Sequence, residues 1–400
     1  MRIWRLKLQP RDWAILALLG VILAIGLAFV HSASYRSGPM GEGYYTSSPV
    51  KQVQWIVLGG ILFVGVLSVN YRHLIEHAYL LYLIGMGLLV FVLFFGVESD
   101  VIRAKRWIQA GPFRVQPSEL MKILLILVLA RYLMYKESHR RFGGLIGPFA
   151  LAGVPMLLIA KEPDLGTALV LLPIVFAMLF VAASRVKHLV VIIVLAVALV
   201  PAAWFFMKPY QRERVIAHIA QDDPRRQEPY QLRQAKAAVG SGGWFGKGLG
   251  RGTHNRYNFI PPKTRNNDFI FAVICEEWGF IGANFILLLY LVLFWLCMRN
   301  ADETHHPGGR LIIVGVVAMF GTQVIINTAM AIGQLPIVGL PLPLISYGGS
   351  SMLSSLFGLA LVINVSAYRR IDLGRDVFDP DAAARRGAGP MPEETFMKAS

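Results

Sequence analysis

Long runs of apolar residues are the feature that most constrains how this chain can fold. A helix needs about 20 apolar residues to cross a bilayer, and runs of that order recur along most of the 400 residues. With 55% hydrophobic and 16% charged residues, the composition excludes an ordinary soluble domain. We therefore predict an all-α polytopic membrane protein with about ten transmembrane helices, over residues 14–31, 52–69, 78–97, 117–134, 146–160, 167–183, 188–206, 268–298, 311–332 and 347–367.

The distribution of basic residues predicts the orientation. With the N-terminus in the cytoplasm, the inner segments carry 19 Lys and Arg and the short outer segments carry 7, while 12 more lie in the long connection 207–267. Short loops decide orientation, whereas a connection of this length crosses largely regardless of its charge. We expect both termini to be cytoplasmic, with a large extracytoplasmic loop between helices 7 and 8. Residues 1–371 form one transmembrane domain, and 372–400 read as a disordered cytoplasmic tail.

The segment from Gly240 to Gly282 is polar, basic and rich in glycine at its start, and it ends in an apolar helix. Asp268 lies where that helix is expected to begin. It either caps the helix by accepting hydrogen bonds from the first free N–H groups, or leaves that task to Asn267 and does chemistry. The glycine run 240–252 holds Lys247 and Arg251 and resembles phosphate-binding loops in composition alone, since no strand–loop–helix context supports a nucleotide fold. We expect the half of the segment that holds the glycine run and the sequence IPPKTRNN to be a mobile cover over an anionic substrate.

Two charged residues, Glu119 and Lys122, lie inside an apolar stretch that begins at Pro117. Proline suits the first position of a helix, and an acid near that end complements the helix dipole. A spacing of three residues lets the two side chains pair. Ionisable groups within a membrane span are costly, so the pair is either a structural element that fixes helix packing or part of a functional cavity.

Glu162 and Asp164 lie in the sequence KEPDLG between two apolar stretches at the expected outer face. Pro163 and Gly166 indicate a turn, and Asp164 can cap the following helix. Two carboxylates at this place can instead hold a divalent cation. Both interpretations stay open from the sequence.

Four cations on a short outer loop run against the positive-inside bias. Arg103, Lys105, Arg106 and Arg114 are retained there either to attract anionic lipid or to bind a phosphate-bearing substrate, since guanidinium groups match phosphate oxygens. Glu276 follows Asp268 by eight residues and so falls on nearly the same helix face, where we interpret it as structural.

The stretch 333–351 carries prolines and glycines at membrane depth. Such a loop is tolerated only where protein or a water-filled cavity surrounds it. Scattered histidines and the absence of a Cys/His cluster exclude a zinc site, and no G-x-S-x-G or Ser-His-Asp arrangement is present. Neither an organic cofactor nor a nucleic-acid partner is expected.

At these residues the chain resembles the SEDS family (shape, elongation, division and sporulation) of bacterial membrane proteins. The resemblance runs through residues 12–368 in the blocks KRWIQAGPFRVQPSELMK, EPDLGTAL, YQRERV, the Gly240–Gly282 segment and NTAMAIGQLPIVGLPLPLISYGGSS. It is greater to the elongation branch than to the division branch. The resemblance implies ten helices in the bacterial cytoplasmic membrane and a peptidoglycan glycosyltransferase that polymerises lipid II, a disaccharide-pentapeptide on undecaprenyl diphosphate. A flippase for lipid II, or a septal polymerase of the same family, is the alternative.

By motif, the resemblance implies that Asp268 is the catalytic residue, that Glu119 and Lys122 form the family's ion pair and that Asp164 is its PDLG aspartate. It implies an active site on the extracytoplasmic face, a class B penicillin-binding protein transpeptidase and other elongation-complex membrane proteins as partners. We expect Mg²⁺ or Mn²⁺, held by Asp268 and Asp164, with the diphosphate bound by Arg103, Lys105, Arg106, Arg114, Lys247 and Arg251. The run IPPKTRNND departs from the family's L-P-E-x-H-T-D, so the loop residues before Asp268 are not carried over.

Overall fold

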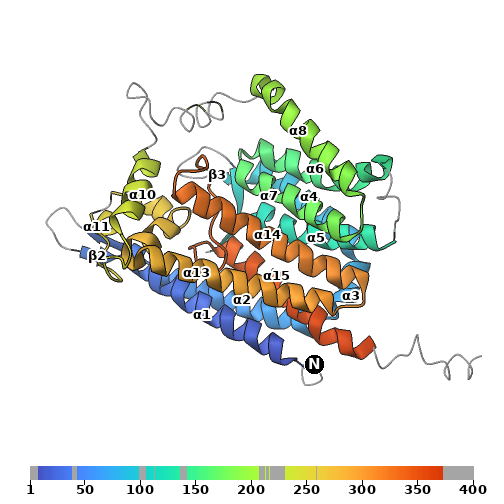
Figure 1. Cartoon of the computed structure of the whole chain (residues 1–400), viewed down its shortest axis with the longest axis horizontal. Helices are drawn as coiled ribbons and strands as arrows, with labels where there is room; N and C mark the ends of the chain where they lie inside the picture. Colours follow the sequence, from blue (N-terminus) through green and yellow to red (C-terminus); the bar gives the residue numbers. More distant parts are fainter. Residues whose placement is uncertain are drawn as a thin grey trace, which may run out of the picture.

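Each of the ten predicted stretches is helical in the computed structural model (Figure 1), which describes residues 8–37, 43–98, 105–111, 113–135, 142–206, 212, 216, 230–257 and 259–372. The predicted boundaries differ from the observed ones by a few residues, because caps and turns decide where a helix ends. The helices are α1 (Pro10–Ala33), α2 (Ser48–Ser68), α4 (Ala78–Phe95), α5 (Pro117–Tyr135), α6 (Ile146–Lys161), α7 (Leu165–Val181), α8 (Val186–Phe206), α13 (Ile270–Asp302), α14 (Pro307–Ala331) and α15 (Gly349–Asp372).

Within the described residues, seven helical segments are long and apolar enough to cross a membrane on their own, namely α1, α2, α4, α6 with the turn before it, α13, α14 and α15. The exposed surface of these helices is rich in large apolar side chains such as Phe94, Leu157 and Leu291. The chain is therefore an all-helical, multi-pass membrane protein. α7 and α8 are shorter apolar helices.

Helix α5 lies at the centre of the bundle and packs against α4, α7, α14 and α15. Nearly all of its side chains from Pro117 to Ala130 are buried. A helix surrounded on all sides does not need a lipid-facing surface, and protein can offer partners to charged groups that lipid cannot. This position explains how α5 carries both Glu119 and Lys122 within its first turns.

Short strands in two connections depart from the all-α prediction. Strands β1 (Tyr35–Ser37) and β2 (Gly43–Tyr45) pair antiparallel after α1. β3 (Val97–Glu98), β4 (Lys105–Ala110) and β5 (Phe113–Val115) form a second small sheet before α5. Gly111, with a φ of 61°, permits the reversal between β4 and β5. The loop that carries Lys105, Arg106 and Arg114 is therefore a hairpin packed on the end of α4.

The long connection 207–267 contains helix α10 (Tyr230–Ser241) and the short helices α11 (Thr253–Arg256) and α12 (Pro262–Arg265). α10 packs on α13 and α14 through its buried residues Leu232, Ala235 and Ala238. For residues 243–248 the prediction of a mobile cover is wrong, because their backbone is hydrogen-bonded to α13.

A short helix, α3 (Tyr71–Glu76), joins α2 to α4, and a single turn at Phe142–Leu145 precedes α6. Asn364 on α15 holds the start of α3, since its Oδ1 accepts from the Tyr71 N–H at 3.0 Å. α15 continues through Asp372, so the predicted boundary of the tail falls within the last turn of this helix. The remainder of the predicted tail, 373–400, lies outside the described residues.

Candidate functional site

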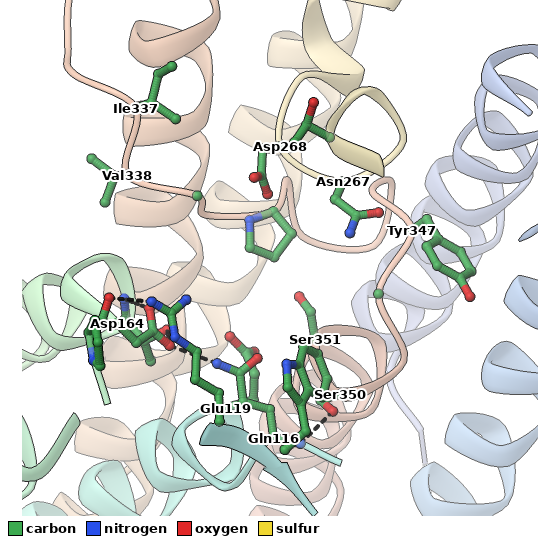
Figure 2. Close-up of a pocket in the computed structure, with 18 of the residues that line it drawn as sticks. Gln116, Glu119, Asp164, Asn267, Asp268, Ile337, Val338, Tyr347, Ser350 and Ser351 are labelled. Atoms are coloured by element: carbon green, nitrogen blue, oxygen red, sulfur yellow. Dashed lines mark hydrogen bonds between the residues drawn. The ribbon is translucent and has the colours of Figure 1, made fainter. Parts of the chain in front are cut away.

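A cavity of about 400 Å³ lies where the ends of α5, α7, α13 and α15 meet the loop 333–348 (Figure 2). Segments far apart in the sequence form it: β4, the start of α5, the α6–α7 turn, α10 and the residues before α13. Three carboxylate residues, Glu119, Asp164 and Asp268, are among its lining. The other lining residues are Arg106, Trp107, Gln116, Pro163, Thr167, Gln231, Thr264, Asn267, Ile337, Val338, Gly339, Pro341, Tyr347, Gly348, Ser350 and Ser351.

Asp268 does not cap α13, so the capping interpretation is wrong. The helix begins at Ile270, and its N-cap, Phe269, makes no side-chain capping bond. The Asp268 backbone is held on both sides: its N–H donates to the Thr264 carbonyl at 2.8 Å, and its carbonyl accepts from Asn327 Nδ2 at 2.9 Å. Its partly exposed side chain points into the cavity in Figure 2.

Asp268 is held in place by two buried polar residues, Arg265 and Asn327. Neither of them was identified from the sequence. Arg265 is fully buried, and its guanidinium donates to the carbonyls of Ala33, at 2.6 Å, and Tyr35. Asn327 on α14 joins the Asp268 carbonyl to the Leu340 carbonyl, at 2.7 Å. The sequence signal for Asn327 was an asparagine inside an apolar helix, because a buried side-chain amide must find hydrogen-bond partners.

The proline-rich loop 333–348 lies against protein on one side and borders the cavity on the other, as predicted. Ser346 Oγ donates to the Asn267 carbonyl at 2.6 Å, and the Tyr347 N–H donates to the Asn266 carbonyl at 2.9 Å. Gln52 and Tyr290 donate to other carbonyls of the loop. Gly339 lies against Asp268, since a Cβ there would be 3.6 Å from Asp268 Oδ2. The loop therefore forms one wall of the cavity at a fixed place.

The predicted pairing of Glu119 and Lys122 is present. Lys122 Nζ lies 2.9 Å from each carboxylate oxygen of Glu119, and Ser354 Oγ donates to Glu119 Oε2 at 3.0 Å. Both side chains are almost fully buried. The pair joins α5 to α15 at the floor of the cavity, which confirms the structural interpretation. Glu119 also lines the cavity, and a functional role of the pair stays a prediction.

Asp164 caps α7, which confirms the capping interpretation of this residue. Its Oδ1 accepts from the Thr167 N–H at 3.3 Å. Its Oδ2 accepts from Thr167 Oγ1 at 2.9 Å, from Gln116 Nε2 at 2.7 Å and from Ser118 Oγ at 3.4 Å. These bonds tie the α6–α7 turn to the start of α5. They also occupy most of the lone pairs that a metal ion would need.

Glu162, next to this turn, is 1% exposed, and both of its carboxylate oxygens are buried without a hydrogen-bond partner. Burial and the charge of Asp164 raise the pKa of Glu162 to about 8, although the nearby Arg106 acts in the opposite direction. Glu162 is therefore largely protonated at neutral pH.

Arg106 is the one cation of the predicted phosphate-binding set that lines the cavity within the described residues. Its Nε donates to the Glu162 carbonyl at 2.8 Å and its Nη2 to the Pro163 carbonyl. Lys105 donates to the Phe94 carbonyl, and Arg114 to Gln109 Oε1 at 3.1 Å. Both lie on the same hairpin outside the lining, and Arg103 lies outside the described residues.

Lys247 and Glu276 form a separate cluster. Lys247 Nζ lies 2.7 Å from Glu276 Oε1, and His254 Nδ1 lies 3.0 Å from the same oxygen. Glu276 is fully buried, so it neutralises the loop's cations rather than facing the cavity. This agrees with its structural interpretation. Arg251 is exposed beside this cluster, and neither cation lines the cavity.

The donor set of the cavity fits a divalent cation only in part. Across the described segments, no three His, Cys, Asp or Glu side chains gather closely enough to hold a metal. Mg²⁺ in phosphate chemistry is usually held by one or two carboxylates together with substrate phosphates. Asp268 with a substrate diphosphate fits that pattern, whereas the hydrogen bonds of Asp164 suit a structural role.

Comparison with known proteins agrees with this geometry. A family model described as "Cell cycle protein" (FtsW, RodA, SpoVE) matches residues 12–371. The chain is 34% identical over 360 residues to stage V sporulation protein E of Bacillus subtilis, covering 88% of this chain and 95% of that protein. It is 33% identical over 361 residues to the peptidoglycan glycosyltransferase MrdB of Escherichia coli K12, covering 90% and 94%.

Solved structures show the same fold. A chain of a peptidoglycan synthase complex, described as coordinating polymerization and crosslinking, superposes with a TM-score of 0.74 at 32% identity, covering 91% of this chain and 99% of that one. The crystal structure of the rod shape determining protein RodA of Thermus thermophilus gives a TM-score of 0.66 at 31% identity, covering 91% and 98%.

Proposed function

The chain belongs to the FtsW/RodA/SpoVE family, the SEDS family, and from this premise we propose that it polymerises glycan strands from lipid II by inverting glycosyl transfer. Relatives at about a third identity across nearly the whole chain are peptidoglycan glycosyltransferases. This chain is an enzyme of that class.

The cavity around Asp268 is the observation that carries the mechanism. A carboxylate-bearing cavity at the end of a membrane bundle suits a donor whose tail lies in lipid and whose diphosphate lies at the surface. The backbone of Asp268 is fixed by Thr264 and Asn327, and the side chain points into the cavity. A fixed carboxylate of this kind supports a role as a general base.

The donor sugar of lipid II is α-linked to diphosphate and the product linkage is β-1,4, so one displacement with inversion suffices. The acceptor hydroxyl attacks the anomeric carbon and its proton passes to the Asp268 carboxylate. The bond from that carbon to the diphosphate breaks, and the diphosphate leaves with the electron pair. Because it leaves without a proton, no second carboxylic acid is required.

Charge on the departing diphosphate needs stabilisation. Arg106 lines the cavity and is braced by the carbonyls of Glu162 and Pro163, which holds its guanidinium in place. Lys105, Arg114, Lys247 and Arg251 lie on neighbouring loops and add positive potential. A divalent cation held by Asp268 and the diphosphate would supply further charge neutralisation. These assignments follow from charge and position.

We also propose the predicted topology, in which all ten long helices cross the membrane and both termini are cytoplasmic, with the cavity on the outer face. The charge distribution supports this orientation. In intact cells, an impermeant maleimide should label a cysteine at position 105 and should reach one at position 302 only after lysis. The reverse pattern would overturn the orientation.

Polymerisation of lipid II by the purified protein tests the function. A variant with Asp268→Asn keeps the size of the side chain and removes the base, so the rate of glycan formation should fall by roughly 10²–10⁴-fold. Asp302→Asn, an exposed acid at the opposite end of α13, is the matched control and should polymerise at the wild-type rate.

Glycan products would be resolved on gels, with and without Mg²⁺ or Mn²⁺. Wild-type rates in the Asp268→Asn protein would remove Asp268 from the mechanism. Movement of lipid II across liposome membranes without any glycan product would instead favour the flippase.

A further inference from the structure

Helix α13 breaks at Gly279, whose backbone (φ 67°, ψ −166°) is not helical. A break inside an apolar helix leaves N–H and C=O groups that lipid cannot satisfy. The glycine-rich loop supplies the missing partners. The N–H groups of Phe280 and Ile281 donate to the carbonyls of Gly243, at 2.8 Å, and Trp244, at 3.1 Å.

Hydrogen bonds are also donated in the opposite direction, from the loop to α13. The N–H groups of Lys247 and Gly248 donate to the carbonyls of Glu276, at 3.0 Å, and Glu277, at 2.9 Å. A Cβ at Gly242, Gly246 or Gly279 would come within 3.0 Å of backbone atoms across this contact. The loop and the broken helix are therefore joined backbone to backbone.

The tip of this rigid loop is strongly apolar and exposed. Trp244 is 67% exposed and Phe245 is 82% exposed, beside Phe280 and Ile281 of α13, which are both more than half exposed. The rings of Trp244 and Phe280 meet edge to face, with 5.2 Å between their centroids. We call these four residues the aromatic tip.

The aromatic tip continues the exposed apolar face of α13. Phe285, Leu288, Val292 and Trp295 follow Ile281 at intervals of three or four residues, and all are exposed. This spacing places them on one helix face. A face of that kind on a membrane-crossing helix lies in lipid, so the tip is the end of a lipid-facing surface.

The length of the helix fixes the depth of the tip. Arg299, whose guanidinium lies 5.3 Å from the Trp295 ring centroid, is the basic residue in the last turn of α13. The stretch from Gly279 to Arg299 rises about 30 Å, at roughly 1.5 Å per residue, which is the thickness of a hydrocarbon core. With Trp295 and Arg299 at one interface, the aromatic tip falls at the other, where tryptophan and its relatives gather.

We propose that the aromatic tip is a membrane-interface anchor, which inserts at the boundary between the headgroups and acyl chains of the leaflet on the cavity's side. Exposed Arg251 follows the tip in the same loop and can meet anionic headgroup phosphates. Because the loop is bonded to Glu276 and Glu277, anchoring the tip fixes the height of the helical segment that begins two residues after Asp268.

Depth-dependent quenching tests the anchor, and the chain is suited to it because its own cysteines, Cys275 and Cys297, are buried. A cysteine introduced as Phe245→Cys would carry an environment-sensitive NBD label in liposomes of phosphatidylcholine and phosphatidylglycerol. Nitroxides would be placed on the lipids either close to the headgroup or near the end of the acyl chain. Leu291→Cys, 64% exposed in the middle of the lipid-facing stretch, and Asp302→Cys, beyond its end, are matched controls.

We expect the shallow nitroxide to quench the label at position 245 at least twofold more than the deep one does. Position 291 should show the opposite order, and position 302 little quenching by either. Trp244→Cys repeats the measurement where Phe245→Cys folds poorly. The proposal is overturned if positions 244 and 245 behave like 302, which places the tip in water. It is equally overturned if their labels report an apolar site that neither nitroxide reaches, which means that protein covers the tip. The readout needs no lipid II, so it stands apart from the proposed activity.

Discussion

At the scale of single residues, three acids near the cavity show how surroundings decide chemistry. Asp268 is partly exposed and points into the cavity. Asp164, two residues from Glu162, is fully used in capping and in joining α5 to α7. Glu162 is buried with no hydrogen-bond partner. The same functional group is thus a carboxylate facing the cavity, a structural clamp and a neutral acid within one small region.

Glu162 makes the stability of the protein depend on pH. Its pKa is raised from 4.5 to about 8 in the fold by burial and by Asp164. The native state therefore binds one more proton than the unfolded chain between those values, so the free energy of unfolding falls as pH rises through this window. We expect the melting temperature in detergent to fall from pH 5 to pH 9, and to fall less in Glu162→Gln.

Asp302→Asn provides a control for that measurement, because Asp302 is exposed and its nearest cation is Arg310, which stays charged across this range. The Asp302→Asn protein should keep the wild-type slope of melting temperature against pH above pH 5. Equal slopes in the wild type and in Glu162→Gln would show that Glu162 does not titrate in this window.

At the scale of elements, the contact between the glycine-rich loop and the break in α13 joins the long connection 207–267 to the bundle. Gly243 and Gly246 both have positive φ, at 57° and 77°. A Cβ at Gly246 would collide with the backbone around Glu277, whereas one at Gly243 meets nothing within 4 Å. An alanine at either position would be strained by the positive φ, but only an alanine at 246 would also collide with α13.

Gly246→Ala should therefore destabilise the protein more than Gly243→Ala. Positive φ alone costs an alanine about 1–2 kcal/mol, and only Gly246→Ala must also separate the loop from α13. Thermal melting of the two variants measures the difference. A Gly243→Ala protein that melts at or below the temperature of Gly246→Ala would contradict the close contact.

At the scale of the whole molecule, relatives named RodA, FtsW and stage V sporulation protein E match most of the chain at similar identities of 30%, 32% and 34%. We propose the elongation role and a class B penicillin-binding protein as the cross-linking partner. One chain of a synthase complex described as coordinating polymerization and crosslinking has this fold, which supports the partnership.

Expression of this chain in a rod-shaped bacterium depleted of its own elongation polymerase should restore rod shape, and expression after depletion of the division polymerase should leave filaments. Asp268→Asn should restore neither, although it should reach the membrane in equal amount. Rescue of division without rescue of shape would assign the chain to the division branch.

Much of this architecture follows from local pattern. Apolar runs predict the ten helices because a helix satisfies its own backbone and needs only apolar surface toward lipid. The spacing of Glu119 and Lys122 predicts their pairing, and the sequence PDLG predicts the cap at Asp164, since both interactions are made within one turn of the chain. The family resemblance singles out Asp268.

What the tertiary structure alone decided involves groups distant in sequence. Asp268 lies before α13 and not at its cap, because Arg265 and Asn327 hold that segment against α1 and α14. Arg106 lines the cavity and Lys247 does not, because one packs against the α6–α7 turn and the other against Glu276. A periodic sequence fixes which residues form a helix, whereas the partner of a buried polar group depends on which helix lies beside it.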